Sequence, residues 1–205
     1  MFRPSILVLS VAAVSVSAPI KADDTLAKIG RALSKSSMIC ANFTQRKSLR
    51  VLTQTLISRG SLVSIAKKGV IWRISQPFRT RVLIKNDALI VWENGDEQRR
   101  VDIWRTQVLH SLSRVFLAVL RGRMDRLSDT FEIESDVSSS NWRLDLKPRE
   151  AVFAAIISRI RASGSRFVDE LRIEEERGDR TVITFSDMRT GPCPLYDDEK
   201  HYFAN

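Results

Sequence analysis

The stretch "GVIWRISQPF" (residues 69–78) indicates the fold most directly. Val70, Trp72 and Ile74 stand at every second position, and Pro77 ends the run. Because the side chains of a β-strand alternate between its two faces, this spacing predicts a strand with one apolar face. Periodicity alone leaves open whether that face packs in an ordinary core or lines a pocket.

The segments on both sides of this stretch have the same alternation. Four segments carry apolar and β-branched side chains with a period of two: residues 38–49, 51–65, 80–87 and 88–96. The sequences "KND" and "ENGD" are typical turns, so these strands are expected to be consecutive and antiparallel. Gly60 interrupts one strand and predicts a bulge or a close backbone approach.

Strands are predicted again in the second half of the chain. Residues 129–136 and 141–148 form a hairpin around "VSSS", and residues 166–187 form another with a Gly-Asp turn. Residues 148–165 are ambiguous: their first turn is compatible with a helix, and the remainder with a strand that ends at the Gly-Ser turn.

Two helices and one helical turn complete the pattern. Residues 23–37 carry apolar side chains on one helical face, and a helical turn is expected near residues 198–202. Residues 104–120 have the spacing of an amphipathic helix. Its apolar residues are Val108, Leu109, Leu112, Val115, Phe116, Val119 and Leu120. The chain shows no strand–helix–strand alternation, so we expect an α+β fold with one antiparallel sheet and helices packed on one side.

The N-terminus has the layout of a secretory signal peptide. A basic residue, Arg3, precedes a short apolar run and then small residues. We place cleavage after Ala22, with Ala18 as the second choice and an uncleaved anchor as the alternative. The remaining residues, 23–205, are expected to form a single domain.

The chain is basic, with a formal net charge of +9. Its Lys and Arg residues form no cluster with interleaved aromatic residues of the kind that binds single-stranded nucleic acid. We therefore expect no nucleic-acid partner. The basic residues are interpreted mainly as the solvated faces of strands, with attraction to anionic lipid head groups as a secondary interpretation.

Cys40 and Cys193 are the two cysteines. In an exported protein an even number favours a disulfide, and two free thiols are the alternative. Two distant cysteines with the isolated His110 and His201 make no metal-ligand spacing, so neither a metal nor another cofactor is expected.

Sequence motifs for catalysis are not evident. Neither histidine accompanies a serine or cysteine in a nucleophile-elbow setting, and no glycine-rich phosphate loop or dinucleotide fingerprint is found. The carboxylates of "EIESD" and "DELRIEEE" alternate with apolar residues, which is typical of the solvent-exposed face of a strand. We expect a protein that is not an enzyme.

The apolar faces of the strands and of the 104–120 helix are expected to meet. The strand residues assigned to that face are Val70, Trp72, Ile74, Val82, Ile84, Ile90, Trp92, Trp142, Leu144, Leu146, Ile183 and Phe185. Close packing of the helix gives a core, and a loose cover on a curved sheet gives a hydrophobic cavity with a lid.

Four short motifs follow one another along the chain in a characteristic order. The segments are "ANFTQRK", then "SRGSL", then "GVIWRISQPF", with "EERGDRTVITF" near the end. In order and spacing they resemble the periplasmic outer-membrane lipoprotein carrier proteins, the LolA family. The residues that carry the resemblance are Phe43, Thr44, Gln45, Gly60, Trp72, Gln76 and Pro77. Trp92 lies where the family has an aromatic strand after a turn.

The resemblance implies an incomplete, half-open β-barrel closed by lid helices. Its apolar concave face would take up the acyl chains of a lipoprotein or another envelope lipid. Partners would be an inner-membrane donor and an outer-membrane acceptor, and the protein would be a periplasmic monomer. The residues expected to bind acyl chains are the strand residues from Val70 to Leu144 above with Leu109, Leu112, Val115, Phe116 and Val119.

One departure from the family concerns its latch. The family has an arginine before the tryptophan that holds the lid helices, and Ala66 stands at that place here, followed by Lys67 and Lys68. Lys67 is a candidate substitute. The helix ending at Arg121 is also longer and more regular than the family's lid segment, which suggests a divergent branch with another lipid as cargo.

Two other functions remain in competition. The same half-barrel occurs in a periplasmic sensor that binds a protein partner, although that protein has a second domain. An enzyme acting on envelope lipids is the third hypothesis, for which the sequence offers no nucleophile.

Overall fold

The fold is a single curved sheet. A computed structural model of the protein describes residues 30–31, 37–85, 88–93, 97–102, 115–120, 127–138 and 140–203. Within these residues, eleven strands form one sheet in the order β6-β5-β4-β3-β2-β1-β11-β10-β9-β8-β7, and every neighbouring pair is antiparallel. The strands of the first half are β1 (Met38–Ser48), β2 (Leu56–Ile65), β3 (Gly69–Gln76), β4 (Thr80–Ile84), β5 (Ala88–Glu93) and β6 (Glu97–Asp102). Those of the second half are β7 (Phe131–Val137), β8 (Trp142–Pro148), β9 (Ile157–Gly164), β10 (Val168–Glu175) and β11 (Arg180–Thr190).

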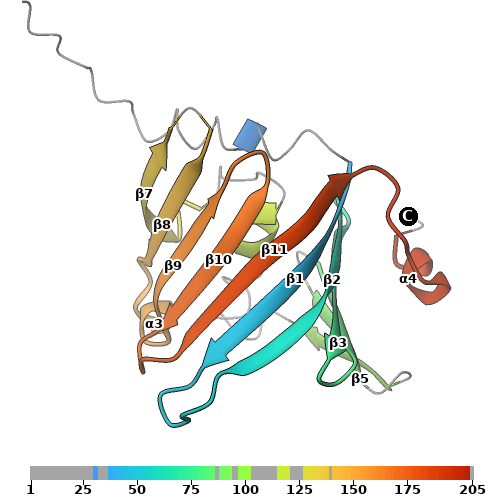
Figure 1. Cartoon of the computed structure of the whole chain (residues 1–205), viewed down its shortest axis with the longest axis horizontal. Coiled ribbons are helices and arrows are strands. Elements are labelled where there is room, and N and C mark those ends of the chain that lie inside the picture. Colours follow the sequence, from blue (N-terminus) through green and yellow to red (C-terminus); the bar gives the residue numbers. More distant parts are fainter. Residues whose placement is uncertain are drawn as a thin grey trace, which may run out of the picture.

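The first strand lies in the middle of the sheet, not at an edge. β1 pairs with β2 on one side and with the last strand, β11, on the other. Figure 1 shows the sheet bending sharply between β1 and β3, so that β3 to β5 form one wing and β7 to β11 the other. The predicted antiparallel sheet is therefore confirmed as a curved, open sheet.

Helices contribute little to the described residues. α3 (Ala151–Ala154) connects β8 to β9, α4 (Asp197–His201) lies in the C-terminal tail, and residues 115–120 are helical. Most of the helix expected at 23–37, and residues 104–114 of the helix expected at 104–120, fall outside the described residues. No helix among the described residues is long and apolar enough to cross a membrane.

Several local predictions are confirmed. The hairpins β7–β8 and β10–β11 form where turn residues separate alternating strands, and Gly178 takes a φ of +90° in the second turn. The ambiguous segment resolves as α3 followed by β9, and α4 occupies the expected helical turn. β6 was not predicted, although the "NG" of the preceding turn is a strong hairpin signal that calls for a strand after it.

Gly60 lies where two strands approach most closely. The β2–β3 register shifts between Arg59 and Gly60, and a Cβ atom on Gly60 would lie 1.8 Å from the carbonyl oxygen of Arg73. Phe43 is its cross-strand neighbour in β1, and the Phe43 ring covers the space that a side chain would fill. Both readings of Gly60, a bulge and a close approach, are confirmed.

The wing formed by β3 to β5 is buried on both faces. Its concave face joins the large inner cluster, which includes Val70, Trp72 and Ile84. Its convex face carries a second cluster of Ile71, Leu83, Ile90, Trp92 and Phe203, which we call the outer cluster. The C-terminal tail, residues 191–203, covers that face, with α4 on the right of Figure 1.

Candidate functional site: the inner apolar face

Trp72 is the centre of the inner face. Its indole stacks on Phe43 of β1 with ring centroids 3.8 Å apart, and it meets Phe116 and Phe185 edge to face at 5.6 Å and 6.2 Å. These rings come from β1, from the helical segment 115–120 and from β11. Since edge-to-face and offset-stacked rings attract one another, Trp72 joins the sheet to the segment that covers it.

The segment 115–120 packs its apolar side chains on the concave face. Val115 and Val119 are 1 % exposed, and Leu120 is also buried, whereas Phe116 is only partly buried beside Trp72. The sequence spacing predicted this apolar face for a helix at these positions. The segment therefore covers the wing of β3 at the point where the aromatic residues converge.

The inner cluster continues across the other wing. Trp142, Leu144 and Leu146 of β8 are buried, and the Trp142 indole N–H donates a hydrogen bond to the carbonyl oxygen of Ser165 at 2.8 Å. Phe131 and Phe153 meet edge to face with centroids 5.5 Å apart. The result is one apolar surface that runs from β4 to β7.

Apolar side chains that retain some exposure surround this surface. They are Ile74, Val82, Leu89, Phe116, Ile133, Val137, Phe185 and Met188. Among the described residues, the buried charged side chains are Arg73 and Glu199, and both belong to the convex side. The inner face is thus apolar, and the described residues place no buried charge on it.

Most of the predicted binding residues lie on this face. Val70, Trp72, Ile74, Val82, Ile84, Val115, Phe116, Val119, Trp142 and Leu144 all belong to the inner cluster or pack against it. Leu109 and Leu112 lie outside the described residues. The sequence interpretation missed Phe43 and Leu62 as members, although Ala41 and Phe43 alternate within β1 as the inward residues of a strand do.

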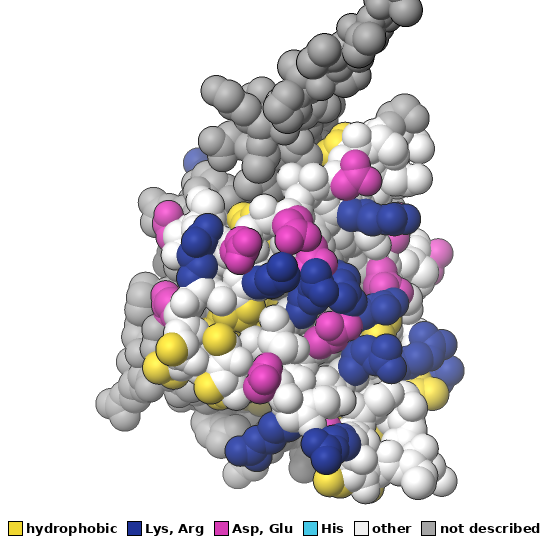
Figure 2. All heavy atoms as spheres, turned by 90° about the vertical axis from the view of Figure 1, so that its left-hand side faces the viewer, with side chains coloured by type: hydrophobic (Ala, Val, Ile, Leu, Met, Phe, Trp, Pro, Cys, Tyr) yellow, Lys and Arg dark blue, Asp and Glu magenta, His cyan; other side chains and the backbone are white. Residues whose placement is uncertain are grey.

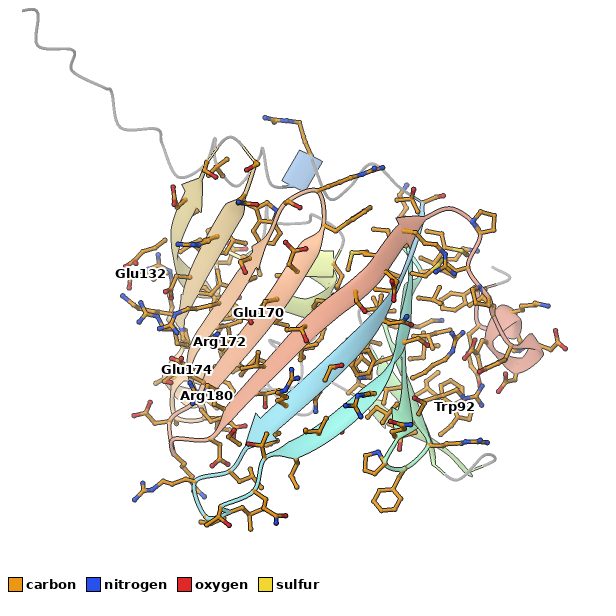
Figure 3. The ribbon with its side chains drawn as sticks, viewed as in Figure 1. Trp92, Glu132, Glu170, Arg172, Glu174 and Arg180 are labelled. Atoms are coloured by element: carbon orange, nitrogen blue, oxygen red, sulfur yellow. A yellow bond between two sulfur atoms is a disulfide. The ribbon has the colours of Figure 1, made fainter. Side chains whose placement is uncertain are left out.

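The prediction that Ile90 and Trp92 share the face of Trp72 is wrong. Leu83 pairs with Ile90 and Arg81 pairs with Trp92 across β4 and β5, so both residues point to the convex side. Trp92 lies on the side of β3 to β5 that faces the tail (Figure 3). The sequence "ALIVW" is apolar at every position, so its alternation does not identify the inward set.

A tail clamp closes the convex side. We use this name for the contacts of residues 193–203 with Lys68 and with β1, β3, β4 and β5. The structure contains the Cys40–Cys193 disulfide, with Cα atoms 5.9 Å apart, which anchors the start of this segment to β1. Tyr202 meets Trp92 edge to face at 5.4 Å, and Lys68 Nζ donates a hydrogen bond to the carbonyl oxygen of Phe203.

Two arginines of the wing hold the acids of α4. Arg73 Nε donates to Glu199 Oε1 at 2.8 Å, and Arg81 Nη1 donates to Asp198 Oδ1 at 3.0 Å. Glu199 is 1 % exposed. The hydrogen bond from Arg81 lowers the pKa of Asp198, and the nearby positive charge adds to this effect while partial burial opposes it. The same hydrogen bond raises the pKa of Arg81.

An open groove of about 960 Å³ runs beside the clamp. Its walls include Arg73, Arg81, Trp92 and Tyr196, and it extends to the β3–β4 turn. The Arg73 guanidinium lies 4.7 Å from the centre of the Tyr196 ring. Arg73, Arg81 and Trp92 place this groove on the convex side, and Ile74, which packs against the inner cluster, also borders it.

Lys67, the candidate latch, lies in the β2–β3 turn. Its φ is +65° and its side chain is exposed. The contacts that a latch would make with residues 104–114 fall outside the described residues, so this role stays a prediction.

Several solved structures align with this chain. A DUF1329 family protein from Desulfovibrio piger aligns with a TM-score of 0.51 and 14 % identity, over 88 % of this chain and 96 % of that one. A LolA superfamily protein from Nitrosomonas europaea aligns at 0.47 and 12 %, over 83 % and 94 %. MucB in complex with MucA from Pseudomonas aeruginosa aligns at 0.40 and 13 %, over 87 % and 60 %.

The family assignment comes from the sequence. No curated protein matches the chain. The family described as outer membrane lipoprotein carrier protein LolA-like matches residues 15–184, which is most of the chain and includes the β1, β2 and β3 motifs described above. The chain therefore belongs to the LolA-like family of outer membrane lipoprotein carrier proteins.

Proposed function

We propose that this protein is a periplasmic carrier that shields the acyl chains of a lipoprotein or another envelope lipid on its inner apolar face. It moves them from the inner towards the outer membrane. The observation that carries the proposal is the continuous apolar surface centred on Trp72, which a short helical segment covers through Phe116. The family to which the chain belongs is described as carrying lipoproteins, and this supports the proposal.

The physical need for such a carrier is large. Each methylene group exposed to water costs about 0.8 kcal/mol, so a molecule with several acyl chains does not leave a membrane unaided. A carrier has to cover that surface and later release it. A cover whose described contacts are apolar suits this requirement, because acyl chains can replace those contacts with equivalent ones.

The proposed binding residues are those of the inner face. We retain Val70, Trp72, Ile74, Val82, Ile84, Leu109, Leu112, Val115, Phe116, Val119, Trp142 and Leu144, and add Phe43 and Phe185. Ile90 and Trp92 leave the set because they lie in the outer cluster. In this proposal segment 115–120 moves away from Trp72 to admit the cargo.

The remaining parts of the proposal concern the setting. The protein is exported, acts as a monomer and is not an enzyme. A donor at the inner membrane loads it, and an acceptor at the outer membrane receives the cargo. Lys67 stays the candidate substitute for the family's latch arginine.

Mass spectrometry of organic extracts tests the proposal. Protein isolated from periplasm without detergent is expected to release acyl-containing molecules in near-stoichiometric amount. A fluorescent fatty-acid probe is expected to bind the delipidated protein, and Phe116→Ser is expected to weaken that binding at least tenfold. Phe116 is only partly buried, so this variant is expected to keep its fold, which circular dichroism checks.

The matched control is Tyr202→Phe, which changes a side chain of the outer face and leaves the inner face intact. It is expected to bind the probe like the wild type. Equal binding by a folded Phe116→Ser variant, or extracts without acyl species, would count against the carrier. A stoichiometric protein partner in lipid-free preparations would favour the alternative, a regulatory module.

A further inference from the structure

Exposed apolar side chains gather at one end of the sheet. Among the described residues, seven of the eight exposed large hydrophobic side chains lie there, in or beside the β1–β2, β3–β4 and β8–β9 connections. We call this the hairpin end, the lower end in Figure 1. Its members are Val51, Leu52, Leu56, Ile57, Phe78, Val152 and Ile156. The two most exposed members lie in the β1–β2 and β3–β4 connections: Val51 is 88 % and Phe78 is 78 % exposed.

The connections of this end are held together. Arg50 N donates a hydrogen bond to Asp179 Oδ1 at 2.8 Å, which joins the β1–β2 connection to the β10–β11 turn. Glu176 N donates to the carbonyl oxygen of Ile156 at 2.9 Å, which joins that turn to the β8–β9 connection. These two hydrogen bonds therefore join the β1–β2 connection, the β10–β11 turn and the β8–β9 connection along one edge.

The part of the sheet that bears Val51 and Phe78 carries charged side chains of one sign. Residues 38–85, which form β1 to β4, contain ten Lys and Arg residues and no Asp or Glu. Acids from elsewhere pair with Lys47, Arg73 and Arg81. Within the described part of the chain, no ion pair involves Arg50, Arg59 or Arg79, which flank the exposed apolar residues.

The opposite wing differs in this respect. Figure 2 shows Lys and Arg interspersed with Asp and Glu on the β7 to β10 side. Asp145 pairs with Arg159 at 2.6 Å and Arg161 pairs with Glu174 at 2.8 Å, so acids and bases of this face pair with one another. Figure 3 shows Arg172 beside Glu170 in the same way. Arginines without an ion pair among the described residues thus flank the exposed apolar residues of the β1–β2 and β3–β4 connections.

We propose that the hairpin end docks on a membrane surface that contains anionic lipid. Exposed apolar side chains flanked by arginines match the interface of a bilayer, where apolar groups enter the acyl boundary and cations meet phosphate groups. Val51, Leu52 and Phe78 enter the bilayer, and Arg50 and Arg79 contact the phosphates. Phe78 and Arg79 also line the groove described above.

Docking does not depend on the inner face, because the hairpin end is on the rim of the sheet and carries its own exposed residues. It goes beyond the proposed function, since it places the protein directly on a bilayer during loading or delivery. The two proposals fail separately: vesicle binding reports docking, and probe binding reports the inner face.

Vesicle co-sedimentation tests the inference. The purified protein is expected to bind vesicles of phosphatidylethanolamine and phosphatidylglycerol at least tenfold more tightly than phosphatidylcholine vesicles, and high salt is expected to weaken that binding. The triple variant Val51→Ser, Leu52→Ser and Phe78→Ser is expected to lose at least tenfold, and so is Arg50→Gln with Arg79→Gln. All of these positions are exposed, so folding is expected to be unaffected.

Two matched controls accompany these variants. Val51→Ile with Phe78→Leu keeps the apolar area and is expected to bind like the wild type. Lys85→Gln removes one charge from the same acid-free segment at the other end of the sheet, and is expected to change binding less than twofold. In addition, Phe78→Trp is expected to show a blue-shifted emission that brominated lipids quench.

Three outcomes would overturn the inference. They are equal binding to both kinds of vesicle, undiminished binding by the triple serine variant, and a dimer in light scattering that the triple variant abolishes. The last outcome would assign the hairpin end to an interface between two copies of this chain.

Discussion

Arg73 Nε and Glu199 Oε1 lie 2.8 Å apart across 126 residues of sequence, and Glu199 is almost fully buried. The residue before Arg73 is Trp72, which points to the other face of the same strand. One strand therefore serves two structures, the inner apolar face through Trp72 and the tail clamp through Arg73. The predictions below separate the two.

Removing the acid of this pair is expected to destabilise the protein. Glu199→Ala leaves the buried Arg73 guanidinium without its carboxylate, which costs about 3 kcal/mol in the free energy of unfolding. Urea denaturation measures the change. Asp197→Ala, which removes the exposed Lys200 pair, serves as the control and is expected to cost less than about 1 kcal/mol.

A compensating variant makes the test sharper. Arg73→Met with Glu199→Leu replaces both charges by apolar groups and is expected to be more stable than Glu199→Ala alone, because no buried charge is left unpaired. A double variant as unstable as the single one would contradict this account of the clamp.

The disulfide is expected to stabilise the tail clamp. Cys40→Ala with Cys193→Ala removes a cross-link that spans 153 residues of sequence and is expected to lower the free energy of unfolding by about 2–4 kcal/mol. Hydrogen exchange at residues 193–203 is expected to accelerate most, since these residues lose their anchor. Fatty-acid probe binding is expected to persist, because the clamp lies on the opposite face. Loss of probe binding together with retained protection of the tail would contradict the separation of the two faces.

The clamp is expected to weaken in acid. A carboxyl group whose pKa is lower in the folded state stabilises the fold above its unfolded pKa, about 3.9 for Asp. That contribution is lost as the pH falls through the folded pKa. Because the pKa of Asp198 is lowered, its contribution is present at neutral pH, begins to fall as the pH approaches about 4, and is lost as the pH drops through the lower folded pKa. Urea midpoints of the wild type and Asp198→Asn are expected to differ at neutral pH and to converge in acid; a constant difference would be the contrary result.

Gly60 is expected not to tolerate a side chain. A Cβ atom there would lie 1.8 Å from the Arg73 carbonyl oxygen, so β2 and β3 would have to separate. Gly60→Ala is expected to cost about 1–3 kcal/mol, the range of overpacked sites, whereas its neighbour variant Ser61→Ala is expected to be near neutral. Thermal unfolding compares the two, and equal melting temperatures would show that the strands are less closely apposed.

Much of the fold follows from local signals. Strand alternation, the "KND" turn and the glycine turns determine hairpins, since each is a property of neighbouring residues. The apolar face of residues 115–120 was evident for the same reason. The even cysteine count likewise favoured the disulfide that the structure contains.

Only the tertiary structure shows on which face of the sheet each strand residue lies. "ALIVW" is apolar at every position, and "GVIWRISQ" places Ile71 in the outer cluster between the inward Val70 and Trp72, so a period of two does not distinguish an inner face from an outer one there. Only the folded chain brings residues 193–203 over β3 to β5, because the contact joins segments more than a hundred residues apart. The sequence by itself determined that Trp72 lies on an apolar strand face. The tertiary structure decided that Trp92 lies on the opposite one, because a sheet covered on both sides removes the polar pattern that would otherwise distinguish them.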